Sequence, residues 1–502
     1  MSALNSDSSS SVPMRTTGHA MIWAGGGRAI RAGMQVLYVV LLARAISPEL
    51  LASAVIGLLG HQVVATLTTQ PVHQALVQGR DWSRTAISAS FWINALLCLI
   101  VLLIMVACGP LAARTLDLPP VSWLLPMIGL GALAGIPTTL PMARLTADMA
   151  FNRIVLIESV SSIVSGLAAI ACLMMGMGLF SLAVFSVGQR IVEGVGFAMA
   201  GRWASGLSLS GGAMRRITGY SVPLICVQIL GLANQSIDQL MIGKILSPVD
   251  LGLYGFGRRL VSQPSQMIAF AVARTSFPAL VSVAGQRGAL TRDVALLTRY
   301  STLGGTAMFF AAALLAPFVF PLVLGPEWDG AAYVTSVMCI GASILPLNAV
   351  AAAALRAAGR TSWTLWLTIL NLVLLVAALI VVFQAGAGLR TVAVAVAAVQ
   401  VSMVIPCFWL AAVALGVPVS VPAAAVLRGA APATLALGAG LLPAILPLGL
   451  GGVTLFAAEF SLAAIMFVVV SVPTNFDLVR FAIKLVTRGR SGASSVQPER
   501  ST

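Results

Sequence analysis

Charged residues are scarce in this 502-residue chain: Asp, Glu, Lys and Arg make up 9% of it, whereas 59% of the residues are hydrophobic. An average soluble domain has about 25% charged residues, so this composition excludes a soluble globule of this size. Apolar runs of about 20 residues, the length that crosses a bilayer as a helix, recur from residue 17 to residue 473. The sequence therefore predicts an all-α integral membrane protein.

Motifs of several protein classes are absent as well. No GxxxxGK[ST] loop is present to bind nucleotide phosphates, so we do not expect the chain to hydrolyse ATP. The six cysteines stand singly in apolar runs without a metal-ligand spacing, which indicates packing residues and predicts neither a metal site nor another cofactor. The polar, serine-rich amino terminus lacks a basic segment followed by an apolar core, which predicts a disordered tail and not a cleaved signal peptide.

Acidic residues are fewer than basic ones, 15 against 29, which gives a net charge of +14. The basic residues lie in short connections between spans, so topology explains them and no nucleic-acid partner is expected. One side carries only four of them, Arg44, Arg114, Lys244 and Arg390. Because cytoplasmic loops are rich in Lys and Arg, that side is predicted to face outward and both termini are predicted to be cytoplasmic. The fourteen predicted spans are 17–44, 50–78, 85–110, 121–144, 152–175, 178–200, 218–246, 250–281, 294–324, 331–356, 361–384, 389–415, 421–446 and 452–473.

Two segments 200 residues apart resemble each other. LLARAISPELLASAVIG at 41–57 aligns with MIGKILSPVDLGLYGFG at 241–257, with Ser-Pro at the same place in both. Six spans separate the copies, and an even number gives the two halves the same orientation, as in parallel repeats. The predicted domains are a disordered cytoplasmic tail (1–16), a six-helix lobe (17–200), a cytoplasmic linker (201–216), a second six-helix lobe (217–415), two additional helices (416–473) and a basic cytoplasmic tail (474–502) that contacts membrane lipid.

The first span carries a polar face made of Arg28, Arg31, Gln35 and Tyr38, at i, i+3, i+7 and i+10. At 1.5 Å per residue, Arg28 lies about 16 Å and Arg31 about 21 Å from the start of the span, close to mid-membrane. Neither arginine has a carboxylate in its own helix. Guanidinium groups at that depth predict a wet cavity that binds a phosphate-like anion. The alternative is structural pairing with Glu158 or Glu193.

Polar positions recur in later spans. Gln62, Thr66, Thr69 and His73 share a face of the second span and predict a cavity wall, in which His73 either titrates or is simply hydrogen-bonded. Glu158 has no partner in its own helix, so it is a candidate site for a coupling proton or cation. Arg190 and Glu193 stand at i, i+3, which predicts a structural salt bridge.

The stretch 228–278 predicts two apolar helices joined by a Ser-Pro turn. Asp238 and Arg258 lie 9 residues before and 10 residues after that turn, so the hairpin brings them to nearly the same depth. We therefore expect a structural Asp238–Arg258 pair, with ion coupling at Asp238 as the alternative. Arg259 lies about 100° further round the helix. It is predicted to face the cavity, together with Gln263, as a substrate-binding residue.

Several segments resemble the Wzx-type polysaccharide exporters of the MOP flippase superfamily. They are FWINALLCLIVLLIM (91–105), ARLTADMAFNRIVLIESVSSIVSG (143–166), SIDQLMIGKILSPVDLGLYGFGRRLVSQP (236–264), FPAL (277–280) and LVLGPEWDGAAYV (322–334). The resemblance implies two parallel six-helix lobes around a cationic cavity that opens alternately to the cytoplasm and the periplasm. It also implies a bacterial inner-membrane location and, as substrate, a polyprenyl-diphosphate-linked oligosaccharide, with other polysaccharide assembly proteins as candidate partners.

In the lipid II flippases of the same superfamily, the first, second, seventh and eighth helices line the cavity. In this sequence those helices carry Arg28, Arg31, Gln62, His73, Asp238 and Arg259. We therefore predict a flippase for repeat units of exopolysaccharide, capsule or O-antigen, and not an enzyme. An ion-coupled multidrug exporter of the same fold would favour an acidic cavity, whereas arginines predominate here. A membrane glycan polymerase or ligase would carry large outer loops, but the outer connections are only a few to about ten residues long.

Overall fold

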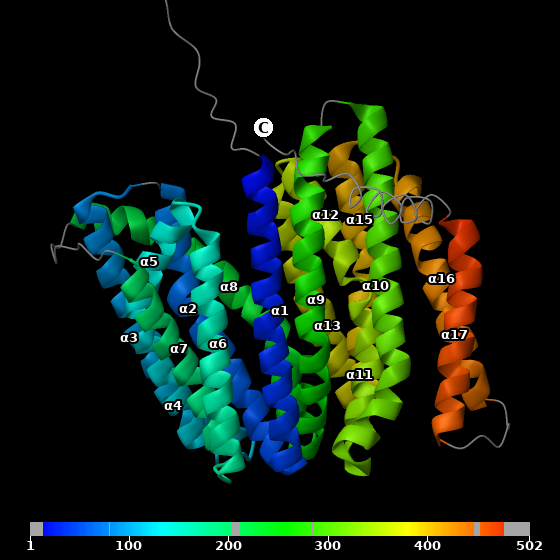
Figure 1. Ribbon diagram of the computed structural model, residues 1–502, viewed down its shortest axis with the longest axis horizontal. Helices are drawn as coiled ribbons and strands as arrows, with labels where there is room; N and C mark the ends of the chain where they lie inside the picture. The colour runs from blue at the N-terminus through cyan, green and yellow to red at the C-terminus, as the bar shows by residue number, and fades with distance from the viewer. Residues whose placement is uncertain (1–13, 80, 202–210, 284–285, 446–451, 476–502) are drawn as a thin grey trace, which may run out of the picture. The chain divides into compact units, whose positions relative to one another are not determined.

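The computed structural model describes residues 14–79, 81–201, 211–283, 286–445 and 452–475. Within these ranges every regular element is a helix (Figure 1). The first nine are α1 (Met14–Ala45), α2 (Pro48–Gly79), α3 (Arg84–Thr115), α4 (Val121–Ala134), α5 (Ile136–Ala147), α6 (Phe151–Met174), α7 (Phe180–Ala200), α8 (Gly211–Ile245) and α9 (Pro248–Ser282). The others are α10 (Arg287–Leu324), η1 (Pro326–Trp328), α11 (Asp329–Ala342), α12 (Leu345–Ala357), α13 (Thr361–Gln384), α14 (Leu389–Ser402), α15 (Val404–Leu415), α16 (Ser420–Ile445) and α17 (Gly452–Thr474).

Each predicted span corresponds to one helix or to two helices separated by a short break. Among the described residues, eleven helical segments are long and apolar enough to cross a membrane, or twelve if the bent pair α4–α5 is one span. The helices α1 and α9, 32 and 35 residues long, are not among them. The protein is therefore a multi-pass membrane protein, and the number of fourteen spans stays a prediction.

Three predicted spans are broken in a way that hydropathy does not reveal. The axis bends by 48° between α4 and α5 at Gly135, two residues separate α11 from α12, and Met403 separates α14 from α15. A proline follows each break within three residues, at Pro137, Pro346 and Pro406. Because proline has no N–H to donate to the preceding turn, the helix is weakened at these points.

The predicted terminal tails lie almost entirely outside the described residues, as do residues 202–210 of the predicted linker. Residues 211–216 of that linker are helical, since α8 begins at Gly211. Ala213 in this first part of α8 is buried. Packing of this turn therefore extends the helix toward the linker further than the hydropathy pattern indicates.

Contacts divide the chain into two compact units. Unit 1 comprises Met1–Met267 and Thr368–Ala395, and unit 2 comprises Ile268–Leu367 and Val396–Thr502. The lobe boundaries drawn from the repeat remain a prediction. All candidate site residues of the sequence analysis fall in unit 1.

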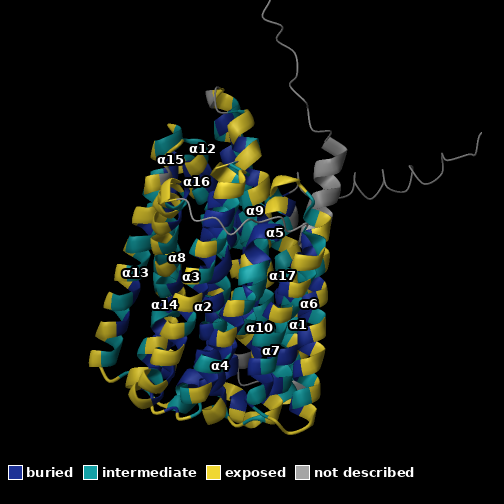
Figure 2. Ribbon diagram, turned by 90° about the vertical axis from the view of Figure 1, so that its left-hand side faces the viewer, coloured by how far each residue is buried: buried dark blue, intermediate teal, exposed yellow. Residues whose placement is uncertain are grey.

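The outward faces of the helices are apolar, as a surface in contact with lipid requires. Figure 2 shows exposed residues along the length of many helices, with buried residues on the faces turned toward neighbours. On α3, for example, Leu96, Leu103 and Leu111 are each more than half exposed. Side chains of this kind on a helix surface would be costly in water, which supports the membrane assignment.

Tyr38 joins α1 to α7 within unit 1. Its hydroxyl group hydrogen-bonds to the Ser181 hydroxyl at 2.9 Å, and its ring stacks on Phe185 with a centroid distance of 4.9 Å. Tyr38 is fully buried. The polar face predicted for the first span therefore ends in a packed contact at Tyr38 and does not continue along a cavity.

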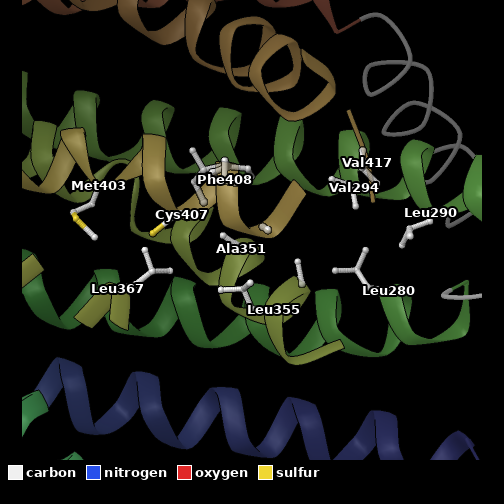
Figure 3. Packing of buried hydrophobic residues seen from close by; sticks show 13 residues of the cluster. Leu280, Leu290, Val294, Ala351, Leu355, Leu367, Met403, Cys407, Phe408 and Val417 are labelled. Carbon is white, nitrogen blue, oxygen red and sulfur yellow. The ribbon is translucent and has the colours of Figure 1, made fainter. Parts of the chain in front are cut away.

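Unit 2 contains a hydrophobic cluster formed by the last turns of α9 with α10, α12, α13 and α15. Figure 3 shows Leu280, Leu355, Leu367 and Cys407 between the helices that carry them. These side chains are all at least nine-tenths buried. Close apolar packing of this kind fixes the helices of unit 2 relative to one another without any ion pair in the cluster.

Candidate functional site

A cavity of about 200 Å³ lies among α1, α2, α5, α6 and α7 of unit 1. Most of its wall is charged or polar, formed by Arg31, His61, Thr69, Gln70, Thr138, Glu158, Gln189, Arg190 and Glu193. Ala65, Met142 and Phe197 complete the wall. Ionisable groups inside a bundle of apolar helices are costly unless they are paired or solvated. This cavity is therefore the candidate functional site.

Arg31 forms an ion pair with Glu158 of α6. This is the structural pairing that the sequence left open as the alternative, and anion binding at Arg31 stays a prediction. Gly27, one turn before Arg31, explains the contact: a side chain at Gly27 would collide with Val155, so the glycine allows α1 to approach α6. The side chains of Arg31 and Glu158 are still 27% and 16% exposed, which leaves both accessible to a ligand in the cavity.

Arg190 and Glu193 form the predicted salt bridge, at 3.3 Å. Glu193 also accepts hydrogen bonds from Gln189 at 3.0 Å and from the Ser161 hydroxyl at 3.5 Å. Arg190 donates a further hydrogen bond to the Thr69 hydroxyl at 3.4 Å. The two charged side chains are only 7% and 10% exposed. Their hydrogen bonds to α2 and α6 are consistent with a structural role that holds these helices around the cavity.

Basic side chains gather near Glu158. Arg31 is paired with it, and Arg28 of the same helix lies within electrostatic range of it. Arg190, on the cavity wall, is paired with Glu193.

Arg259 of α9 adds a further positive charge. Its Nε is buried and has no hydrogen-bond partner among the described residues. Arg259 lies within electrostatic range of His61, which lines the cavity and is also close to Arg190. An Nε–H without a protein acceptor can supply one of the two parallel N–H donors of a bidentate contact with a phosphate group.

Asp238 of α8 and Arg258 of α9 form the ion pair that the hairpin geometry predicts. Tyr254 donates a hydrogen bond to the same carboxylate, and the backbone N–H of Gln239 donates to it at 2.9 Å. Arg258 also donates to the backbone carbonyl of Gln235 at 3.0 Å. Asp238 is fully buried, so these contacts favour a structural role over exchange of an ion with water.

The remaining predicted site residues do not line the cavity. Gln62 donates to the side-chain carbonyl of Gln235 at 3.0 Å and so joins α2 to α8. His73 Nε2 hydrogen-bonds to the Thr146 hydroxyl at 3.0 Å, outside the cavity wall. Gln35 and Gln263 are partly buried, and their proposed contacts with substrate stay a prediction. The polar stripe of the second span therefore reaches the cavity at Thr69 but not at Gln62 or His73.

Several residues of the site were not predicted, among them His61 and Tyr254. His61 lies beside the polar stripe of α2 and not on it, but its i, i+4, i+8 spacing with Ala65 and Thr69 places these three cavity residues on one face. Tyr254 stands one turn before Arg258, a spacing that also could have indicated its contact with Asp238.

Outside the spans, the connection between α2 and α3 is tied to two other helices. Asp81 pairs with Arg216 of α8 at 3.5 Å, and the guanidinium of Arg144 lies 5.1 Å from the centre of the Trp82 ring. Hydrogen bonds from the side chain and the backbone N–H of Ser83 hold the pKa of Asp81 below its usual range, and the charge of Arg216 lowers that pKa further. Asp81 therefore stays ionised, and its pairing with Arg216 persists, at neutral pH.

Comparison with known proteins identifies the family. A family model described as "Polysaccharide biosynthesis protein" matches residues 41–333, more than half of the chain. The chain belongs to this polysaccharide biosynthesis family. The match includes Arg190, Asp238 and Arg259 and begins after Arg31. The resemblance drawn from the sequence is thereby confirmed.

Curated relatives of this polysaccharide biosynthesis family member are bacterial. The succinoglycan biosynthesis transport protein ExoT of Rhizobium meliloti (strain 1021) is 22% identical over 341 residues, which are 68% of this chain and 69% of that protein. The amylovoran biosynthesis protein AmsL of Erwinia amylovora is 21% identical over 304 residues, which are 57% and 75% of the two chains.

The fold of this polysaccharide biosynthesis family member is similar to that of a solved flippase. Lipid II flippase MurJ, in an inward closed conformation, matches with a TM-score of 0.71 over 92% of this chain and 99% of that chain. The two sequences are 11% identical, so the likeness concerns the fold alone. It confirms the predicted all-α, MOP-type membrane fold.

Proposed function

We propose that this protein is a flippase that moves a polyprenyl-diphosphate-linked oligosaccharide across the cytoplasmic membrane by alternating access. The family match, the names of ExoT and AmsL and the flippase-like fold support a transporter of polysaccharide precursors and not an enzyme. A diphosphate cannot cross hydrocarbon unaided, because the loss of its hydration is too costly. Arginines inside the protein replace that hydration while the lipid tail stays in the bilayer.

Arg259 is the observation that carries this proposal. Its Nε is buried and has no hydrogen-bond acceptor among the described residues, and the side chain lies within electrostatic range of His61 on the cavity wall. A multidrug exporter for cationic drugs would instead present free carboxylates. Here both cavity carboxylates, Glu158 and Glu193, are paired with arginine.

Replacing Arg259 with alanine is expected to abolish export. Truncating one side of a buried charged contact costs about 2 kcal/mol or more, which corresponds to roughly 30-fold weaker binding of the diphosphate. The measurement is the amount of lipid-linked oligosaccharide that accumulates in the inner leaflet of cells that carry the variant as their only copy. Arg259→Lys keeps the charge but loses the planar, bidentate guanidinium, so we expect it to export at an intermediate level.

Arg114→Ala is the matched control, because Arg114 is an exposed arginine at the end of α3. It removes the same charge from the chain but should leave export unchanged. Normal export by Arg259→Ala, in protein that reaches the membrane in normal amounts, would rule out Arg259 as the diphosphate site.

Ion coupling at Glu158 is a further part of the proposal. Glu158 faces the cavity and holds Arg31 in an ion pair. Protonation of Glu158 weakens that pair and releases Arg31 for the diphosphate, so that the ionised Glu158 carboxylate and the substrate compete for one arginine. Asp238 is the weaker candidate for coupling, because three donors already surround its carboxylate.

A Glu158→Gln variant tests this coupling. In proteoliposomes that contain lipid-linked oligosaccharide, we expect a proton gradient to accelerate flipping by the native protein and to have no effect on the variant, because glutamine cannot take up the proton. Equal stimulation of both proteins would contradict a coupling role for Glu158. The flipping rate of each protein with the gradient is compared with the rate of the same protein without it. A lower overall rate of the variant therefore does not obscure the result.

The orientation of the chain and its partners are also proposals. The positive-inside distribution supports cytoplasmic termini, with the short connection between α1 and α2 on the periplasmic side. Proteins that assemble the same polysaccharide are the partners that such a transporter would meet at its two faces.

A further inference from the structure

His73 of α2 is a partly buried titratable residue outside the cavity wall. Its Nε2 lies 3.0 Å from the hydroxyl oxygen of Thr146 on α5. That hydroxyl donates its one proton to the backbone carbonyl of Met142 at 2.8 Å, so it accepts from His73. His73 is therefore the neutral tautomer with hydrogen on Nε2. Its Nδ1 carries a lone pair, and this atom is buried without a hydrogen-bond partner among the described residues.

The unpartnered Nδ1 of His73 is an open position for a proton. A buried polar atom without a partner costs about 1–3 kcal/mol, so it calls for an explanation. The two ring nitrogens of a histidine take different roles when one of them is held by a hydrogen bond. Here the bond to Thr146 fixes the orientation of the ring through Nε2 and leaves Nδ1 free to accept a proton.

The His73–Thr146 pair lies between the cavity and one end of the bundle. The cavity residue nearest the carboxyl end of α2 is Gln70, and on α5 it is Met142. His73 and Thr146 follow these two residues by three and four positions, about one helical turn on each helix. Gly79, the last residue of α2, comes six residues after His73, a length of about 9 Å. The charge distribution assigns this end of α2 to the cytoplasm.

Charged residues near this end of the bundle do not include a neutral base. Those in the cytoplasmic halves of the helices packed against α2 are Arg84 of α3, Arg144 of α5, Arg190 and Glu193 of α7, and Arg215 and Arg216 of α8. The adjoining carboxylates Asp81 and Asp148 are paired with Arg216 and Arg144. Among these residues and those of α2 that follow Gln70, only His73 combines a neutral state with a free lone pair on nitrogen.

We propose that His73 passes protons between the cavity and the cytoplasm. The inference rests on the proposed uptake of a coupling proton by Glu158. When Glu158 releases that proton, its carboxyl O–H bond breaks and, through water in the cavity, an N–H bond forms at Nδ1 of His73. The imidazolium then gives the same proton to water on the cytoplasmic side, and the ring regains its starting tautomer. Nδ1 is enclosed in this structure, so both transfers take place as the helices part during the transport cycle.

The tautomer of His73 can be tested without any substrate. Nitrogen-15 NMR of the protein in lipid, labelled in its three histidines, distinguishes a nitrogen that carries hydrogen from a bare one. At neutral pH we expect hydrogen on Nε2 of His73 and none on Nδ1. The His73→Gln variant identifies the two signals, because it lacks them. Hydrogen on Nδ1 and a bare Nε2 would overturn the proposal, since Nδ1 could then not accept a proton.

The His73→Gln variant also tests the relay in transport. Glutamine keeps an N–H group for the Thr146 hydroxyl but takes up no proton. In proteoliposomes that contain a polyprenyl diphosphate carrying one hexose, each protein is compared with itself, with and without a proton gradient. We expect the acceleration by the gradient to be about tenfold smaller in His73→Gln than in the native protein, because a positioned proton carrier contributes at least that much to a proton transfer.

Thr146→Val is the matched control. It removes the hydrogen bond to Nε2 but leaves an imidazole that can take up a proton, so the gradient should still accelerate flipping. If Thr146→Val loses the acceleration as His73→Gln does, the hydrogen bond is structural and the relay is wrong. Full acceleration of His73→Gln would overturn the relay alone. If the native protein flips none of this lipid, the proposed function fails and the relay fails with it.

Discussion

Export is expected to fall at least tenfold when Arg31 is replaced by alanine, for two separable reasons. The change removes a guanidinium from the cavity wall, and it leaves Glu158 without its ion-pair partner. Loss of one partner of a fully buried pair costs about 3–5 kcal/mol. Arg31 is 27% exposed, so the cost in stability here is smaller. Export, measured as released polysaccharide, and the thermal unfolding midpoint of the purified protein report the two effects.

The double variant Arg31→Ala, Glu158→Gln separates binding from pairing. Because alanine and glutamine are both neutral, the double variant removes both charges of the pair, so we expect its unfolding midpoint to return most of the way to the native value. Export should nevertheless stay low if Arg31 meets the diphosphate. Recovery of export together with stability would show that Arg31 serves only to neutralise Glu158.

Replacing Asp238 with asparagine is expected to destabilise the protein more than any other single change considered. Asp238 is fully buried and its carboxylate binds Arg258 and Tyr254. The substitution leaves Arg258 charged, with its side chain only 16% exposed and no carboxylate partner. The expected loss is about 3–5 kcal/mol. A large drop in the unfolding midpoint, and in the amount of protein that reaches the membrane, would be the direct readout.

A second substitution provides the check on that interpretation. Arg258→Gln in the Asp238→Asn chain removes the uncompensated charge, so part of the lost stability should return. Tyr254→Phe alone removes one hydrogen bond to Asp238 and should cost about 1 kcal/mol. If the double variant is no more stable than Asp238→Asn alone, the ion pair is not what holds the α8–α9 hairpin, and a coupling role for Asp238 gains support.

Hydropathy was sufficient to place the helices, because lipid imposes a nearly uniform apolar length on each span. The predicted span 361–384 coincides with α13, and most other ends agree within a few residues. The breaks at Gly135 and Met403 escaped prediction, since apolar composition continues across them. Only the proline that follows each break could have indicated it, because the missing N–H of proline weakens a helix without changing its hydropathy.

The ion pairs were predictable only where the chain itself brings the partners together. The Asp238–Arg258 pair follows from a short turn, and the Arg190–Glu193 pair from helical spacing. The partner of Arg31 could not be deduced in the same way, because Glu158 comes from a helix more than a hundred residues away. Its position depends on the packing of α1 on α6. Gly27 permits this packing, but a glycine in the sequence does not predict which helix will pack against it.

Tyr38 and Asp238 occupy equivalent places in the two repeats, 200 residues apart, and both are fully buried. Tyr38 ties α1 to α7, outside its own hairpin, whereas Asp238 ties α8 to its hairpin partner α9. The same position of the repeat therefore fastens the two hairpins differently: the second hairpin is joined within itself by an ion pair, whereas the first is joined to α7 by a hydrogen bond and a ring stack.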